Sequence, residues 1–141
     1  MGFRLKVEGG SAVELREESI ISVKFGADIP QDSNARSTDL GSTVEIKGKI
    51  LTAVDGDPFD STKELGKWAL VPAERADCYR KVVIEVIAAS QVVRKYTFSN
   101  AFVVDYKEEY GDEVGVGTFS LTIKQKKDKM ANITVEGGYS V

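Results

Sequence analysis

The sequence contains no histidine in its 141 residues and a single cysteine, Cys78. Without histidine, the chain lacks the side chain that most often acts as a general base or binds a metal near neutral pH. One cysteine rules out an internal disulfide framework, and with no histidine to activate it this thiol is a poor candidate nucleophile. Because these absences exclude much of enzyme chemistry, we expect a protein that is not an enzyme and needs no cofactor.

Long apolar runs and an excess of basic residues are missing as well. No stretch approaches the roughly 20 apolar residues that cross a bilayer, and residues 1–7 alternate instead of forming a signal peptide. Lys and Arg number 19 against 22 Asp and Glu, giving a net charge of -3, whereas nucleic-acid binders are usually basic. We expect synthesis in the cytoplasm without a signal peptide, no membrane span and no nucleic-acid recognition.

Alternation of apolar and polar residues is the dominant pattern, and it is typical of half-buried β-strands. Among the strands we expect one helix over residues 61–70, ended by Pro72. We predict one domain over residues 1–141 of mainly β class, an antiparallel split β-barrel or sandwich with one short flanking α-helix. The expected strands cover residues 3–7, 19–25, 43–50, 79–87, 92–98, 101–106, 117–124 and 133–135, with 92–98 and 101–106 either separate or joined through a bend.

The predicted helix has a candidate cap and a candidate anchor. Ser61 and Glu64 have the spacing of a capping box, in which the serine hydroxyl accepts a hydrogen bond from the Glu64 amide and the Glu64 carboxylate reaches back. Leu65 and Trp68 fall at helical spacing, and Trp68 is most simply an anchor in the core. These four residues are therefore expected to start the helix and hold it against the sheet.

Two motifs resemble ligand sites, but each lacks a necessary part. Asp55, Asp57 and Asp60 resemble a calcium loop, yet Gly66 stands where the bidentate glutamate belongs. Residues 114–117 resemble a phosphate-binding glycine loop, yet a strand rather than a helix follows them. We expect no metal site and no catalytic site, and we interpret the aspartates as an acidic turn before the helix.

Two charged segments lie in the last third of the chain. Residues 107–113 hold clustered carboxylates and are expected to form an exposed turn, whereas residues 124–129 form a basic run. The basic run has no interleaved aromatic residues, which disfavours nucleic-acid binding. It is interpreted either as a solvated strand end or as an electrostatic contact with an acidic patch, such as residues 107–113, on another copy.

Two further features point to contact with other subunits. Residues 26–41 form a long polar loop, and such loops are unusual unless they are functional, the alternative being a disordered surface tip. The fourth predicted strand carries Val82 and Ile84 on one face, and Val83 and Ile87 on the other. A strand that is apolar on both faces needs covering on both sides, which a lone small barrel does not provide.

The order of these elements resembles the tube proteins of contractile injection machines, namely phage tail tubes, phage-tail-like bacteriocins and the haemolysin-coregulated proteins of type VI secretion. The resemblance rests on the strand-loop-strand of residues 19–50, the capped helix, a hairpin through residues 96–103 (YTFSNAFV) and the strand 117–123 (GTFSLTI). In that family the last hairpin has a segment of the type aromatic, apolar, Asn-Ala, apolar, and a strand of the type aromatic-Ser-Leu-Thr-Ile follows a charged turn.

The resemblance implies copies that form hexameric rings, stacked as the inner tube of a phage tail or phage-tail-like contractile injection apparatus. Its implied partners are further copies of itself and sheath, baseplate or spike proteins, and its implied location is a virion tail or tail-like particle. An extended loop would contact a neighbouring subunit or ring through Asp28, Ile29, Pro30, Gln31, Asp32, Asn34 and Arg36. Polar strand faces would line the lumen, with the candidates Glu45, Lys47, Lys49, Thr118, Ser120, Thr122 and Lys124.

Two other functions stay open at this point. A monomeric β-sandwich that binds carbohydrate or protein would expose a row of aromatic residues. A carrier of the lipocalin type would enclose an apolar cavity. The residues that could form the aromatic row are Tyr79, Tyr96, Phe98, Phe102 and Tyr106.

Overall fold

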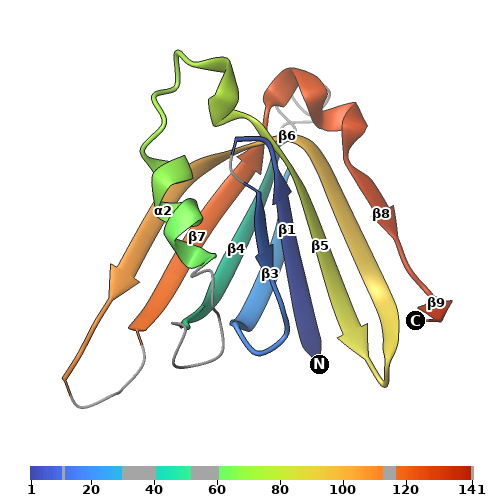
Figure 1. The fold of residues 1–141 in the computed structure, drawn as a ribbon. Helices are drawn as coiled ribbons and strands as arrows, with labels where there is room; N and C mark the ends of the chain where they lie inside the picture. The colour runs from blue at the N-terminus through green and yellow to red at the C-terminus, as the bar shows by residue number, and fades with distance from the viewer. Residues whose placement is uncertain (11, 30–40, 52–60, 113–116, 141) are drawn as a thin grey trace.

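The computed structural model describes residues 1–10, 12–29, 41–51, 61–112 and 117–140 (Figure 1). Its strands are β1 (Gly2–Glu8), β2 (Val13–Leu15), β3 (Ile20–Asp28), β4 (Gly41–Ile50), β5 (Arg80–Ala88), β6 (Gln91–Glu109), β7 (Gly117–Gln125), β8 (Thr134–Glu136) and β9 (Tyr139–Ser140). The helix α2 (Thr62–Ala69) and the 3-10 helices η1 (Ala76–Cys78) and η2 (Lys127–Asn132) complete the described elements.

The long strand β6 joins the two halves of the sheet, in which the strands follow the order β2-β1-β5-β6-β7-β4-β3 (Figure 1). Its first part pairs with β5 from Gln91 to Ala101, and its last part pairs with β7 from Ala101 to Glu109. All pairs are antiparallel, and β8 and β9 add to the first part of β6. The described strands bend around a core without closing into a full barrel, so the predicted fold class, a split barrel or sandwich with a flanking helix, is confirmed.

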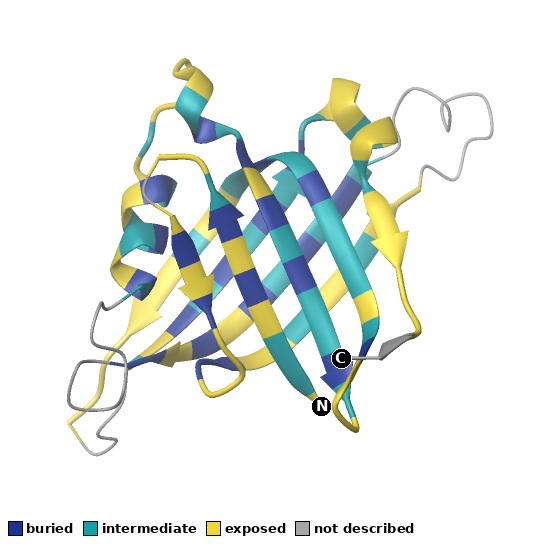
Figure 2. Ribbon diagram, turned by 45° about the vertical axis from the view of Figure 1, so that its right-hand side comes forward, coloured by how far each residue is buried: buried dark blue, intermediate teal, exposed yellow. Residues whose placement is uncertain are grey.

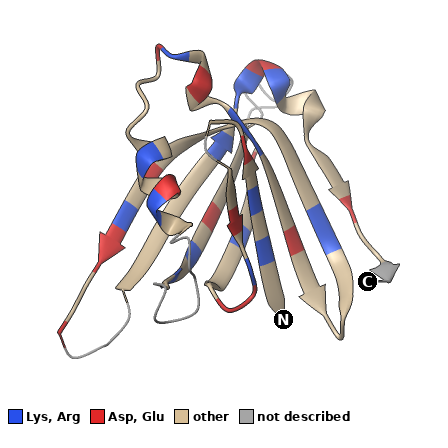
Figure 3. Cartoon of the chain, viewed as in Figure 1, with Lys and Arg blue, Asp and Glu red and all other residues tan. Residues whose placement is uncertain are grey.

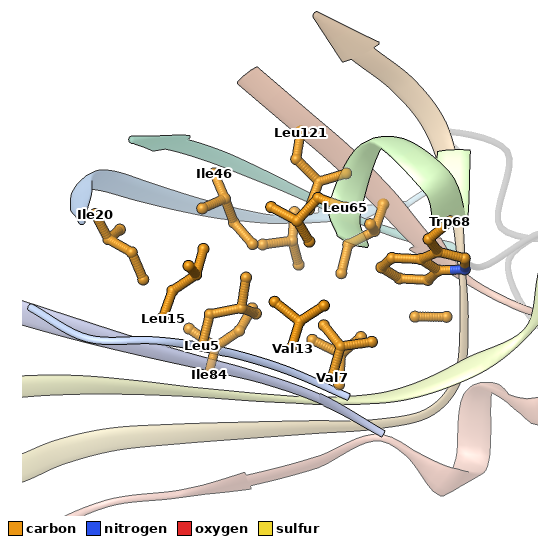
Figure 4. Packing of buried hydrophobic residues seen from close by; sticks show 14 of the residues in the cluster. Leu5, Val7, Val13, Leu15, Ile20, Ile46, Leu65, Trp68, Ile84 and Leu121 are labelled. Atoms are coloured by element: carbon orange, nitrogen blue, oxygen red, sulfur yellow. The ribbon is translucent and has the colours of Figure 1, made fainter. Parts of the chain in front are cut away.

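Alternation along the strands builds the core, as the banding of buried and more exposed residues in Figure 2 shows. On β7 the side chains of Phe119, Leu121 and Ile123 are buried, while those of Thr118 and Ser120 are not. In Figure 4, Ile46 and Leu121 from one half of the sheet face residues of the other half, with Leu65 and Trp68 at one end. The residues that face them are Leu5, Val13 and Ile84.

The helix α2 is fixed to the sheet through Trp68, which is 1% exposed. The indole Nε1 donates a hydrogen bond to the backbone oxygen of Cys78 at 2.8 Å, and the guanidinium of Arg80 lies 5.6 Å from the centre of the indole ring. Burial lowers the pKa of Arg80 from its ordinary value, while the carboxylates of Asp77 and Glu64 act in the opposite direction. Trp68 therefore links the helix to η1 and to the start of β5.

The predicted capping box is wrong, although the helix begins at the expected place. Ser61 has helical backbone angles, φ -59° and ψ -26°, and makes no side-chain capping hydrogen bond. A capping serine needs extended backbone angles to direct its oxygen at the free amides of the first turn. The Glu64 amide instead donates to the Ser61 backbone oxygen at 3.2 Å, and the Glu64 carboxylate lies 3.5 Å from Lys67 Nζ.

Three other expectations about the chain path need correction. β6 is one continuous strand, which confirms the joined alternative for residues 92–98 and 101–106. No hairpin therefore interrupts residues 96–103, and residues 107–109 belong to this strand rather than to a turn. β3 continues to Asp28 and β4 begins at Gly41, so the loop between them is shorter than residues 26–41. The short strands β2 and β9 were not expected from the pattern, because each is only two or three residues long. The candidate motifs Asp55-Asp57-Asp60 and residues 114–116 lie outside the described residues.

Gly48 allows β3 and β4 to approach each other next to β7. A Cβ atom at this position would lie 2.3 Å from the Ser19 backbone oxygen and 2.5 Å from Cε1 of Phe119. The neighbouring Lys49 amide donates to the same Ser19 oxygen at 2.7 Å, so the backbone there has little room to move. A side chain at residue 48 would therefore collide with the sheet and with the core together.

We expect the substitution Gly48→Ala to lower the free energy of unfolding by about 1–3 kcal/mol, the usual effect of overpacking. The matched control is Gly26→Ala on the partner strand, where a Cβ would meet only the Thr43 oxygen at an ordinary 4.0 Å. Urea unfolding followed by tryptophan fluorescence measures both variants. Equal stability of the two variants would contradict this account of Gly48.

Candidate functional site

The outer face of β4 and β7 is polar along its whole length. Odd-numbered residues of β4 and even-numbered residues of β7 alternate with the buried side chains of these strands. Residues of this face lie directly opposite one another in the register, in the pairs Thr43↔Lys124, Glu45↔Thr122, Lys47↔Ser120 and Lys49↔Thr118. All the candidate lumen residues predicted from the sequence therefore lie together on one face of one strand pair.

The same polar face continues onto the strands on either side. Lys24 of β3 lies opposite Glu45, and Asp105 of β6 lies opposite Thr122. Rows of side chains therefore cross four strands, and neither of the two central rows contains an apolar residue. These rows are Lys24-Glu45-Thr122-Asp105 and Ser22-Lys47-Ser120-Lys107.

Charges of both signs are interspersed on this polar face. Asp105 Oδ2 lies 3.7 Å from Nζ of Lys107, and Asp28 Oδ2 lies 3.7 Å from Nζ of Lys124. Asp28 also accepts a 2.8 Å hydrogen bond from the hydroxyl of Thr43. The carboxylates on these strands are thus balanced by lysines, and the face has no strong field of one sign (Figure 3).

The residues predicted to contact a neighbouring subunit are described only in part. Asp28 is the last residue of β3, where Thr43 and Lys124 hold its carboxylate. Ile29 follows it and is 49% exposed. Pro30, Gln31, Asp32, Asn34 and Arg36 lie outside the described residues.

A second polar face, which was not predicted, covers the other half of the sheet. Arg4 lies opposite Glu85, Glu85 opposite Lys95, and Lys95 opposite Glu136, so charges alternate in sign across β1, β5, β6 and β8. The alternation of Arg4, Lys6 and Glu8 in the sequence was a sign of this face. The set of residues on this face could not be predicted without the strand order, because β1, the pair β5 and β6, and β8 are far apart in the chain.

The expectation that β5 leaves an apolar face uncovered is wrong. Ile87 is 7% exposed and Val83 is half-buried, so the chain itself covers much of the second face of this strand. The exposed large apolar side chains lie elsewhere. A shallow groove of about 560 Å³ between α2 and β6 holds Leu70 and Val104, which are 83% and 45% exposed.

The aromatic residues that could have formed a binding row do not lie together. Phe98 is buried, and Tyr96 stacks on Phe25 with 4.7 Å between ring centres. Tyr106 stacks on Phe119 at 6.5 Å, while Tyr79 packs edge-on against Phe102. The five aromatics are thus divided between the core and one end of the sheet. They do not form the exposed row that a carbohydrate-binding module would have. Those residues are Tyr79, Tyr96, Phe98, Phe102 and Tyr106.

The described ranges contain no helix that is long and apolar enough to cross a membrane. Within the same ranges no three His, Cys, Asp or Glu side chains are grouped so that they could hold a metal ion. The regular pattern of polar residues described above lies on a sheet face and not in a cleft.

The fold is similar to those of several solved proteins, some of them from contractile injection systems. It is similar to Hcp1 from Flavobacterium johnsoniae, with a TM-score of 0.58 and 19% identity over 98% of this chain and 97% of that one. It is also similar to a chain of the anti-feeding prophage baseplate, with a TM-score of 0.56 and 12% identity over 96% and 93% of the two chains. A chain of the PVC sheath-tube complex, from an extracellular contractile injection system, gives a TM-score of 0.53 at 10% identity over 97% and 89%.

These similarities span nearly the full length of both chains in each pair, so they concern the whole fold rather than a shared hairpin. The resemblance found in the sequence is therefore confirmed at the level of the fold. No family model and no curated protein matches the chain in sequence. The likeness thus lies in the arrangement of strands and helix, and not in a conserved set of residues.

The polar face should contribute little to the stability of one copy, because its side chains are solvated. We expect Ser120→Ala to change the free energy of unfolding by less than about 0.5 kcal/mol. The adjacent Leu121 is fully buried, and Leu121→Ala should lower it by about 2–5 kcal/mol. Urea unfolding compares the two variants, and a large loss for Ser120→Ala would show that this face is part of the core.

Proposed function

We propose that the chain is a structural subunit, without catalytic activity, of the inner tube of a phage tail or phage-tail-like contractile injection apparatus. Copies assemble into hexameric rings, and the rings stack into the tube. The observation that carries the proposal is the fold similarity to Hcp1 along 98% of the chain. Similarity to chains of a baseplate and of a sheath-tube complex supports the same role.

The polar face of β3, β4, β7 and β6 is the part that we assign to the wall of the lumen. A tube wall must let cargo pass without binding it, and apolar patches or a field of one charge would retain cargo. Rows in which lysines alternate with acidic and hydroxyl side chains meet this requirement. The residues assigned to the lumen are Glu45, Lys47, Lys49, Thr118, Ser120, Thr122 and Lys124.

The ends of the sheet supply the means of joining copies into a ring. β2 and β3 stand at the two ends of the strand order, where a strand has backbone groups without a sheet partner. Pairing such edges between neighbours would extend the polar face around a closed wall. The segment that begins at Asp28 and Ile29 leaves β3 at this edge, and we assign to it the contact with the neighbouring subunit. Sheath, baseplate or spike proteins are the further partners in a tail-like particle.

Ring formation is tested by measuring the mass of the purified protein and by imaging it. We expect light scattering to give six times the mass of one copy at high protein concentration, and negative-stain electron microscopy to show annular particles or tubes. A protein that stays monomeric at millimolar concentration, with no rings in the images, would contradict the proposal.

The assignment of the lumen is tested with variants that each carry one introduced cysteine. The substitution Cys78→Ala removes the buried native thiol, so that only the introduced thiol can react. A cysteine introduced at Ser120 should react with a small maleimide in the assembled particle, and at least about tenfold more slowly with a maleimide carried on a large protein. The control is Lys6→Cys on β1, a half-exposed position of the second polar face. Equal rates for the bulky reagent at both positions would place the β7 face on the outside.

A further inference from the structure

The two ends of the β6–β7 pair carry opposite charges. Because these strands are antiparallel, Glu109 lies beside Thr118 at one end, and Ala101 lies beside Gln125 at the other. The first end holds the exposed carboxylates of Glu108, Glu109 and Asp112. The second end leads into Lys126 and the helix η2, which carries two further lysines (Figure 3). We call the first the acidic end and the second the basic end.

The acidic end gains further carboxylates from a neighbouring turn. β4 ends at Ile50 opposite Gly117, and β3 starts at Ile20 opposite Gly48, so both lie at the same end of the sheet. The exposed Glu17 and Glu18 precede β3 in this turn. Glu17 and Glu18 thus add carboxylates to this end, where Arg4 Nη2 lies 3.7 Å from Glu17 Oε1.

The basic end contains a pocket of about 620 Å³. Tyr79 and Phe102 line it and pack edge-on with 5.8 Å between ring centres, and Lys126 Nζ lies 5.0 Å from the centre of the Tyr79 ring. Lys124 and Lys127 also line the pocket, so it combines an aromatic surface with three lysines. Such a pocket suits a segment that brings both an aromatic ring and carboxylates.

Two lysines of this pocket already contact carboxylates. Lys124 Nζ lies 3.7 Å from an oxygen of Asp28, and Lys126 Nζ lies 3.8 Å from an oxygen of Asp128. Both lysines are at least 40% exposed in their side chains, so an approaching carboxylate can share them. Charge-assisted contacts of this kind are stronger than those between neutral groups.

One buried hydroxyl in this pocket lacks a partner among the described residues. Ser42 lines the pocket, is 2% exposed, and its Oγ makes no hydrogen bond. A buried hydroxyl without a partner destabilises a protein by roughly 1–3 kcal/mol, and most such groups in proteins are satisfied. Within the described residues, the polar groups around this pocket are therefore not all satisfied.

The acidic end presents an aromatic side chain of matching chemistry. Tyr110 is 66% exposed, and its hydroxyl donates a 2.6 Å hydrogen bond to Glu108. Its ring lies over Gly117, where a Cβ atom would come within 2.7 Å of it. Tyr110 is thus held in a defined position, with carboxylates before and after it in the chain.

We propose that the acidic end of one copy, residues 108–112, docks into the lysine-rimmed pocket at the basic end of a second copy. The donor and acceptor surfaces lie at opposite ends of the same strands, so the contact is heterologous and can repeat in one direction. The inference rests on the proposed function and deepens it. It assigns the chemistry of the contact between stacked rings, makes that contact sensitive to salt, and gives the stack a direction.

Charge reversal at each end tests the contact. One variant carries Lys126→Glu and Lys127→Glu and is acidic at both ends, and the other carries Glu109→Lys and Asp112→Lys and is basic at both ends. We expect each variant alone to form rings, with at least about a tenfold smaller fraction of subunits in stacks. An equimolar mixture should restore stacking, because each acidic end then meets a basic end.

The matched control carries Lys6→Glu and Lys95→Glu, which change the net charge by the same amount as the two lysine substitutions at the basic end but lie on the second polar face, outside the paired part of β6 and β7. Circular dichroism establishes that all variants are folded, and sedimentation velocity at low and high salt measures stacking. Stacking that persists in either reversed variant, or a mixture that does not stack, would overturn the inference. Neither result affects the proposed ring, which fails only if the unaltered protein forms no rings.

Discussion

The strict alternation of side chains along β4 and β7 is the constraint on which the other features depend. When a residue on one of these strands faces the core, the residues before and after it must face outward. The buried residues are Val44, Ile46, Leu121 and Ile123, and the residues that therefore face outward are Glu45, Lys47, Ser120 and Thr122. The antiparallel register then places the polar residues of one strand opposite those of the other. A shift by one residue would turn charged side chains into the core, so the polar face and the apolar core have a single cause.

This arrangement explains how a chain without histidine can have a defined role. Chemistry at a cleft depends on a few reactive groups in unusual environments, whereas a wall depends on many ordinary groups in a regular pattern. The guanidinium of Arg80, whose pKa burial lowers, lies 5.6 Å from the centre of the Trp68 indole ring, away from the polar face.

The sequence was most informative where the alternation was long and uninterrupted. Residues 117–124 predicted both a strand and its two faces, and the structure agrees with each. Val13–Leu15 is too short to show the two-residue period of a strand. It forms a strand by pairing with β1, where Leu15 lies opposite Leu5. The capping box failed because spacing does not determine the backbone angles of Ser61. The pocket at the basic end could not be predicted, since Ser42, Tyr79 and Phe102 come together only through the strand order.

The 19 residues of β6 have a mechanical consequence. The strand is bonded to β5 along its first part and to β7 along its last part, so a single run of covalent backbone passes from one half of the molecule to the other. A load along the strand passes from one half of the sheet to the other through the peptide bonds of β6. Within each half, the hydrogen bonds to β5 or to β7 share that load. The two halves of the sheet are therefore coupled along one strand, and a force on one half acts directly on the other.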